Sequence, residues 1–188
     1  MASPVSSTRE QPRFTPDDLL LISDGDRYEL DDGRLVELNV GAESNRVIIR
    51  VAAKLLDVEE RGFGIAIAAE TGMQIFPGRP NRLPRPDGGF ILRERLQSNS
   101  LDPGFLTTAP DLVVEVVSPG DKMDAVIAKV EEYFTAGVRL AWVFLPESRR
   151  VLVLKPDVPG MLLGPDDVLD GGGVLPEFGS PVADFFPR

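Results

Sequence analysis

The segment from Pro110 to Pro119 constrains the fold more than any other part of the chain. Its sequence is Pro-Asp-Leu-Val-Val-Glu-Val-Val-Ser-Pro, and a short run of Leu and Val bounded by prolines is typical of a buried β-strand. Glu115 lies in the middle of this run, where a carboxylate is costly to bury unless a neighbouring group compensates it. We therefore expect Glu115 to be ion-paired, bound to a metal or protonated.

The chain contains no cysteine and no histidine among its 188 residues. This composition excludes disulfides, thiolate nucleophiles, Ser-His triads and ordinary zinc sites. Any metal must be bound by oxygen, which favours magnesium, manganese or calcium.

The formal net charge of −10 argues against a broad basic surface for nucleic acid. A divalent metal and a local cluster of arginines could still offset phosphate repulsion. Charged loop residues in solvent are the simpler interpretation of that cluster, which consists of Arg79, Arg82, Arg85, Arg93 and Arg95.

Length and a hydrophobic fraction of 43% predict one globular domain. We expect this domain to span residues 13–188, and the small, polar residues 1–12 to form a flexible tail rather than a signal peptide. No apolar run approaches the ~20 residues that a membrane helix needs. The absence of cysteine is consistent with a cytoplasmic protein.

Local patterns predict a mixed β-sheet flanked by helices, with an N-terminal hairpin around Asp31-Asp32-Gly33. Apolar residues at helical spacing predict two long helices, and Asp121 is expected to cap the second. The glycine- and proline-rich segment 160–188 retains apolar residues and is expected to pack against the core. The expected helices cover residues 15–23, 43–60 and 122–136, and the expected strands cover 27–30, 34–38, 65–70, 73–76, 90–92, the Glu115 segment, 139–145 and 151–154.

Three carboxylates are candidate metal ligands: Asp87, Glu115 and Glu43. Asp87 lies at a proline–glycine junction where a strand begins, so that Asp87 and Glu115 could bind one divalent cation if their strands are neighbours. Glu43 begins the long helix and could supply a third oxygen. The alternatives are a turn role for Asp87, a helix N-terminal role for Glu43, and an ion pair with a buried Arg or Lys for Glu115.

Lys129 is the candidate cation for phosphodiester hydrolysis. An apolar arc runs along the predicted helix 122–136, and Lys122 and Lys129 lie together at its edge, from which their ammonium groups could extend over the sheet. The alternative is that Lys129 extends along the apolar face toward solvent.

The ordered set of motifs resembles the Uma-type restriction endonuclease family of the PD-(D/E)XK nuclease superfamily. The matching pieces are residues 28–37 (Tyr-Glu-Leu-Asp-Asp-Gly-Arg-Leu-Val-Glu), Arg85-Pro86-Asp87, residues 109–119, Asp124, Lys129, Tyr133, Gly137-Val138 and Trp142. The resemblance extends from about Phe14 to the region of Phe185, which is most of the chain.

The resemblance implies a restriction-endonuclease-like α/β core with an added N-terminal hairpin, often dimeric. It implies that Asp87 and Glu115 bind Mg²⁺ or Mn²⁺, with the backbone carbonyl of Val116 as a further ligand, and that Glu43 matches the helical acid of the superfamily. The chain departs from the pattern at two places. First, Val117 occupies the position where the superfamily has a lysine, and the resemblance assigns the role of that lysine to Lys129 instead. Second, Ser44 or Asn45 occupies the position where many relatives have a histidine.

Three functional hypotheses follow. The first is a metal-dependent endonuclease that hydrolyses DNA phosphodiester bonds, with Asp87 and Glu115 holding the metal, Lys129 positioning or activating water and Glu43 assisting. The second is a catalytically degenerate protein that kept the nuclease fold as a binding or dimerisation module, which the acidic charge and Val117 favour. The third is a metal-dependent hydrolase of a small phosphorylated substrate.

Overall fold

A six-stranded mixed sheet forms the centre of the protein, with the strand order β3-β4-β5-β6-β7-β8. The structure is a computed structural model that describes residues 13–38, 41–96, 101 and 104–187. Strands β5 and β6 are parallel, and every other neighbouring pair in this sheet is antiparallel. The strands are β3 (Gly64–Ala68), β4 (Gly88–Leu92), β5 (Leu112–Val116), β6 (Leu140–Leu145), β7 (Arg150–Leu154) and β8 (Met161–Leu163).

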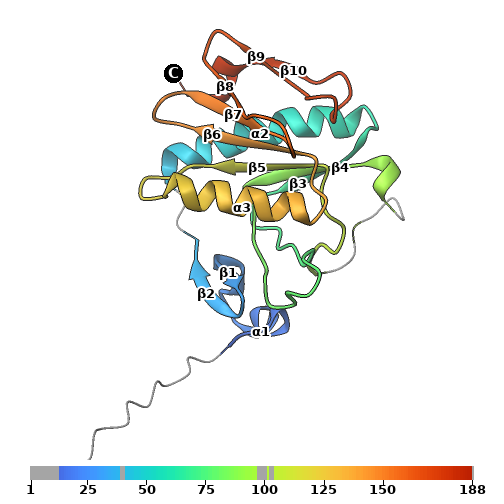
Figure 1. The fold of residues 1–188 in the computed structure, drawn as a ribbon, viewed down its shortest axis with the longest axis vertical. Coiled ribbons are helices and arrows are strands. Elements are labelled where there is room, and N and C mark those ends of the chain that lie inside the picture. Colours follow the sequence, from blue (N-terminus) through green and yellow to red (C-terminus); the bar gives the residue numbers. More distant parts are fainter. Residues whose placement is uncertain (1–12, 39–40, 97–100, 102–103, 188) are drawn as a thin grey trace, which may run out of the picture.

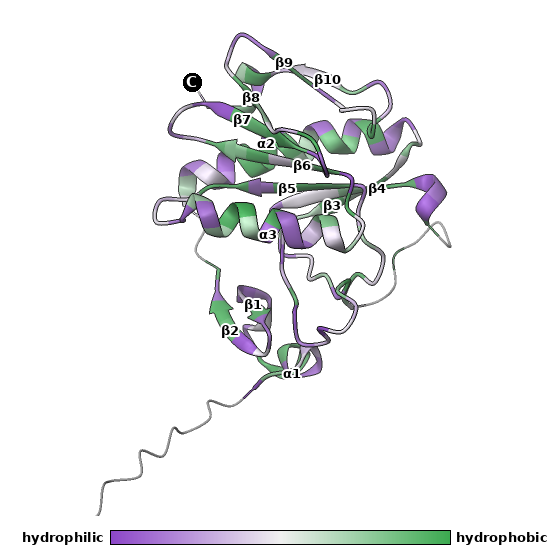
Figure 2. Ribbon diagram, in the orientation of Figure 1, coloured by the Kyte–Doolittle hydropathy of each residue, from purple (hydrophilic) through white to green (hydrophobic). Residues whose placement is uncertain are grey.

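Two helices cover opposite faces of this sheet, α2 (Ala42–Glu60) on one and α3 (Met123–Thr135) on the other (Figure 1). The strands of the sheet are largely hydrophobic, whereas the helices alternate hydrophobic and hydrophilic residues, as expected for helices with one buried face (Figure 2). The predicted α/β architecture, a mixed sheet flanked by helices, is confirmed.

Strand β5 is buried on both faces, and its side chains alternate between the two helices. Val114 and Val116 belong to the apolar cluster beneath α2, whereas Val113 belongs to the cluster beneath α3. Because successive side chains of a strand point to opposite faces, Glu115 shares the face of Val113 and lies under α3. The strand pattern thus places the carboxylate on the α3 side of the sheet.

The N-terminal hairpin, β1 (Tyr28–Asp31) and β2 (Arg34–Glu37), forms a separate two-stranded sheet. Asp32 and Gly33 both have positive φ, at 49° and 87°, as the tight turn of a right-twisted hairpin requires. A capping box at Thr15 starts the short helix α1 (Pro16–Leu21), and the 3₁₀ turn η1 (Gly25–Arg27) leads into β1. The predicted hairpin extension is confirmed.

The C-terminal segment packs on the α2 side of the sheet, as the sequence predicts. It contains β9 (Val168–Asp170), β10 (Gly179–Pro181) and the 3₁₀ turn η3 (Val182–Phe185). Phe185 is fully buried against Phe144, with ring centroids 5.2 Å apart.

Two local predictions are wrong. Residues 73–76 form no strand: β3 pairs with β4 rather than with this segment, whose Met73 makes only an isolated bridge to Leu106. Asp121 does not cap α3, whose N-cap is Lys122 without a side-chain hydrogen bond; its carboxylate instead accepts the Ser118 N–H at 2.7 Å.

Two further expectations concern the chain termini and membranes. The predicted flexible tail, residues 1–12, lies outside the described residues. Among the residues that the structure describes, no helix is long and apolar enough to cross a membrane.

We predict that Phe185→Ala lowers the free energy of unfolding by about 3–5 kcal/mol, because it removes a fully buried aromatic ring from the core. Chemical denaturation measures the change. Leu162→Ala, at a side chain that is 49% exposed, serves as the control and should change stability by less than about 0.5 kcal/mol. Equal effects of the two substitutions would show that the C-terminal segment does not pack as described.

Candidate active site

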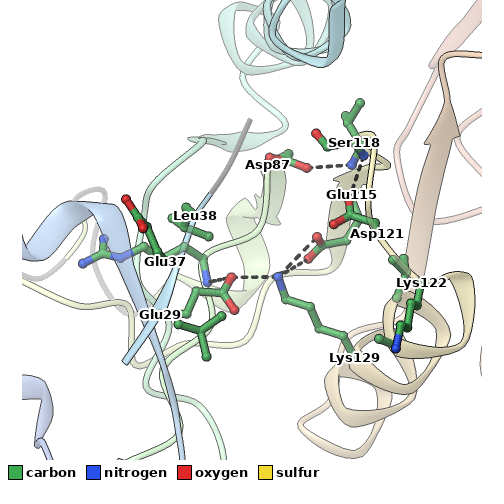
Figure 3. Close-up of a pocket in the computed structure, with 14 residues that line it drawn as sticks. Glu29, Glu37, Leu38, Asp87, Glu115, Ser118, Asp121, Lys122 and Lys129 are labelled. Carbon is green, nitrogen blue, oxygen red and sulfur yellow. Dashed lines mark hydrogen bonds and ion pairs between the residues drawn. The ribbon is translucent and has the colours of Figure 1, made fainter. Parts of the chain in front are cut away.

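A pocket of about 290 Å³ opens beside the C-terminal end of β5, between α3 and the N-terminal hairpin (Figure 3). Acidic, basic and apolar side chains share its wall. The lining residues are Glu29, Val36, Glu37, Leu38, Arg85, Asp87, Glu115, Val116, Ser118, Asp121, Lys122, Ala125, Val126 and Lys129. Four of the predicted site residues therefore line one pocket: Asp87, Glu115, Val116 and Lys129.

Asp87 is fixed at the entrance to β4 by hydrogen bonds to the neighbouring strand β5. Its backbone N–H donates to the Val114 carbonyl at 2.9 Å, and its Oδ2 accepts the Val116 N–H at 2.6 Å. Burial raises the pKa of Asp87 to about 6, although the Val116 N–H and Lys129 favour the ionised form. The turn at this position thus holds a carboxylate whose proton affinity is raised.

Glu115 is buried beneath α3 and has two partners on that helix. Its Oε1 accepts the Tyr133 hydroxyl at 2.8 Å and lies 3.1 Å from the Lys129 Nζ. Burial raises the pKa of Glu115 to about 7; Lys129 opposes the rise, and the nearby Asp87 carboxylate adds to it. We expected Glu115 to be ion-paired, metal-bound or protonated, and in the structure it is ion-paired with Lys129.

Lys129 extends from α3 toward the sheet, as its place at the edge of the apolar arc suggested. Its ammonium donates to Glu29 at 2.7 Å and to Glu115 at 3.3 Å. Burial lowers the pKa of Lys129, but Glu115 and Glu29 outweigh burial and raise it above its ordinary value. The side chain is therefore a paired, charged group rather than one that extends freely to solvent.

Glu29, on β1, is a site residue that the sequence analysis did not single out. Its Oε1 accepts both the Lys129 ammonium, at 2.7 Å, and the backbone N–H of Arg85, at 2.8 Å. The motif around the hairpin contains this residue, but nothing in the local sequence indicates that β1 contacts a helix 100 positions later.

The arginines of the 79–95 region do not form one cluster, and the first three of them are paired rather than free solvated charges. Arg79 and Arg82 both pair with Glu132 of α3. Arg85 is buried and donates to the backbone carbonyls of Tyr28, Gly25 and Glu70. These three arginines connect the loop to the hairpin and to α3. Arg82 and Arg85 are buried, and a buried guanidinium needs such acceptors.

The other two arginines lie at the opposite end of β5. Arg93, in the 3₁₀ turn η2 (Arg93–Arg95), donates to the Gly62 carbonyl at 2.7 Å. Arg95 pairs with the buried carboxylate of Asp111 at 3.2 Å. Neither residue lines the pocket.

The remaining predicted residues have distinct positions. Val116 lines the pocket, at the end of β5. Glu43 lies in the first turn of α2, is exposed, and is not among the pocket residues. The adjacent Ser44 is buried, and its hydroxyl accepts a hydrogen bond from the Ser118 hydroxyl at 3.0 Å, which connects α2 to the segment after β5.

Two of the three predicted carboxylate ligands, Asp87 and Glu115, line the pocket, whereas Glu43 does not. Within the described part of the chain, no group of three or more Asp, Glu, His or Cys side chains is arranged to hold a metal. Mg²⁺ needs no such cage, because it commonly binds one or two carboxylates and keeps water or phosphate oxygens as its other ligands. The carboxylate oxygens of Asp87 and Glu115 are therefore of the kind that a hard divalent cation takes as ligands.

A crystal structure with a similar fold is that of a putative nuclease belonging to DUF820 from Anabaena variabilis, with a TM-score of 0.74. The two chains are 16% identical over 92% of this chain and 97% of the other. No protein of curated function shows significant sequence similarity to this chain.

A sequence model of the family Uma2, described as "Putative restriction endonuclease", matches residues 16–183. The match covers most of the chain. This protein therefore belongs to the Uma2 family, as the resemblance of its motifs implied.

We predict that Tyr133→Phe lowers the free energy of unfolding by about 1–2 kcal/mol, because the buried Glu115 carboxylate loses a hydrogen-bond donor. Urea denaturation measures the difference. Tyr28→Phe is the matched control, since the hydroxyl of Tyr28 has no hydrogen-bond partner among the described residues, and it should cost less than about 0.5 kcal/mol. If both substitutions cost the same, the Tyr133 hydroxyl does not support Glu115.

Proposed function

We propose that this protein is a metal-dependent endonuclease that hydrolyses DNA phosphodiester bonds. The observation that carries the proposal is the convergence of Asp87, Glu115 and Lys129, from three separate elements, on one pocket. Two buried carboxylates and an ammonium group are the residue types that phosphodiester hydrolysis with a divalent cation requires. Membership of a family described as restriction endonucleases supports DNA as the substrate.

Mg²⁺ or Mn²⁺ would be held by Asp87, Glu115 and the backbone carbonyl of Val116. The donor set supports this assignment, because hard cations prefer carboxylate and carbonyl oxygens. Burial raises the pKa of both acids; Asp87 adds to the rise at Glu115, whereas Glu29 and Asp121 add to it at Asp87. A divalent cation would favour the ionised form of both carboxylates. When bound, the ion would polarise a phosphate and lower the pKa of a water.

Lys129 would act as a fixed positive charge near the phosphate rather than as a base. Its raised pKa keeps the ammonium protonated at neutral pH, so it can donate hydrogen bonds to a phosphate oxygen or orient an attacking water. Lys122 is exposed at the same pocket and would contact the nucleic-acid backbone. Glu43 has no part in this proposal, because its side chain is exposed and does not line the pocket.

The proposed active form is a homodimer in the cytoplasm that binds DNA only with a divalent cation present. The formal charge of −10 and the five acidic residues of the pocket would otherwise repel phosphate: Glu29, Glu37, Asp87, Glu115 and Asp121. This dependence follows from charge and makes metal binding the first step to measure.

A second candidate is a nuclease-fold protein without catalysis that serves as a binding or dimerisation module. Val117 stands where the superfamily has its lysine, and Lys129 is paired with two carboxylates, Glu29 and Glu115. This candidate requires that the pocket bind no divalent cation.

We predict that Mn²⁺ titrated by calorimetry binds the wild type and does not bind Asp87→Asn/Glu115→Gln, because the double variant lacks both carboxylate charges. The same variant should lose metal-dependent DNA cleavage while keeping its circular dichroism spectrum. Glu43→Gln is the control and should bind Mn²⁺ as the wild type does.

Two outcomes would contradict this proposal. Cleavage by the double variant at the wild-type rate would show that the site lies elsewhere. A wild type that binds no Mn²⁺, even with a short DNA duplex present, would favour the non-catalytic candidate.

A further inference from the structure

The Lys129 ammonium has two carboxylate partners, and the closer one does not belong to the central sheet. Its Nζ lies 2.7 Å from the Glu29 Oε1 and 3.1 Å from the nearer oxygen of Glu115. Figure 3 shows the ammonium between the two acids, with Glu29 on the hairpin side and Glu115 on the sheet side. Both carboxylates are largely buried, with side-chain exposures of 10% and 11%.

We infer that Glu29 is a positioning residue that keeps Lys129 paired when Glu115 binds the divalent cation. This inference rests on the proposed function and concerns a residue that the proposed metal set does not include. A divalent cation bound to Glu115 would neutralise the carboxylate charge that now pairs with Lys129. Without Glu29, a poorly solvated ammonium would then lie beside a divalent ion with no counter-charge, which is strongly unfavourable.

The charges of the four groups support this role. When ionised, Asp87, Glu115 and Glu29 carry three negative charges, and Lys129 carries one positive charge. The net charge of these four groups is then −2, which one divalent cation would neutralise. The cation would then balance Asp87 and Glu115, while Glu29 would balance Lys129.

Glu29 is suited to hold its position during such an exchange. The oxygen that accepts the Lys129 ammonium also accepts the backbone N–H of Arg85 at 2.8 Å. The Arg85 guanidinium in turn donates to the carbonyls of Tyr28 and Gly25, on either side of the start of the hairpin. Glu29 is therefore anchored to the loop that carries Asp87, two residues after Arg85.

The test is a double-mutant cycle on Mn²⁺ binding by calorimetry, with the full chain. Glu29→Gln should weaken Mn²⁺ binding by about tenfold or more, because it leaves Lys129 without a counter-charge. In the Lys129→Met background the same substitution should change binding by less than about threefold, because no ammonium remains to be balanced. Glu29→Asp, which restores the charge, should recover wild-type affinity to within about threefold.

Glu37→Gln is the matched control. Glu37 is a second hairpin carboxylate in the same pocket, but it pairs with Arg27 at 3.1 Å rather than with Lys129. Its neutralisation should change Mn²⁺ affinity by less than about threefold, which separates the ion pair from the general loss of negative charge. Thermal unfolding checks that Glu29→Gln folds, since its amide oxygen can still accept the Arg85 N–H.

The outcomes separate this inference from the function on which it rests. If Glu29→Gln has no effect, or weakens Mn²⁺ binding equally with Lys129 and with Met at position 129, Glu29 is not the counter-ion and the inference is wrong. Equal weakening would indicate that Glu29 binds the ion itself or only supports the fold. A wild type that binds no Mn²⁺, or whose binding survives Asp87→Asn/Glu115→Gln, overturns the proposed function together with the inference.

Discussion

The pairing of Glu115 with Lys129 beneath helix α3 is the interaction on which the arrangement of the pocket depends. Glu115 lies on a strand that is otherwise apolar, and a carboxylate there is stable only with compensating charge and hydrogen bonds. Helix α3 supplies both, through the Lys129 ammonium and the Tyr133 hydroxyl. The packing of α3 on the sheet and the electrostatics of the pocket are therefore set by the same contacts.

The hairpin contributes charged groups to the pocket and to its surroundings. Its strand β1 brings Glu29 to Lys129, and its carbonyls accept the buried guanidinium of Arg85. Arg82 connects the loop to Glu132 on α3 and to the Leu30 carbonyl. An acidic chain thus uses several of its cations internally. Under the proposed function, the pocket would therefore need an added cation to attract phosphate.

The sequence predicted the parts of the site that follow from local periodicity. The anomalous position of Glu115 and the place of Lys129 at the edge of an apolar arc are both visible without a structure, because strand and helix periods determine which face a side chain occupies. Long-range contacts are not visible in this way. Tyr133 belongs to the same apolar arc, and the hydrogen bond from its hydroxyl to Glu115 depends on how α3 packs against the sheet. The contact between Glu29 and Lys129 depends on how a separate hairpin packs against α3. The strand predicted at 73–76 is wrong for a related reason. Met73 and Ile75 are buried in alternation, as in a strand, but alternating burial alone does not provide a hydrogen-bonded neighbouring strand, and Met73 makes only an isolated bridge to Leu106.

The most direct test of this account is a crystal structure of the protein with Mn²⁺, in which anomalous scattering locates the ion. The account predicts a single peak in the pocket, bound by Asp87 and Glu115, with the Lys129 ammonium on Glu29 alone. A peak elsewhere in the molecule, or none at a concentration that saturates related nucleases, would contradict the assignment of this pocket as the metal centre.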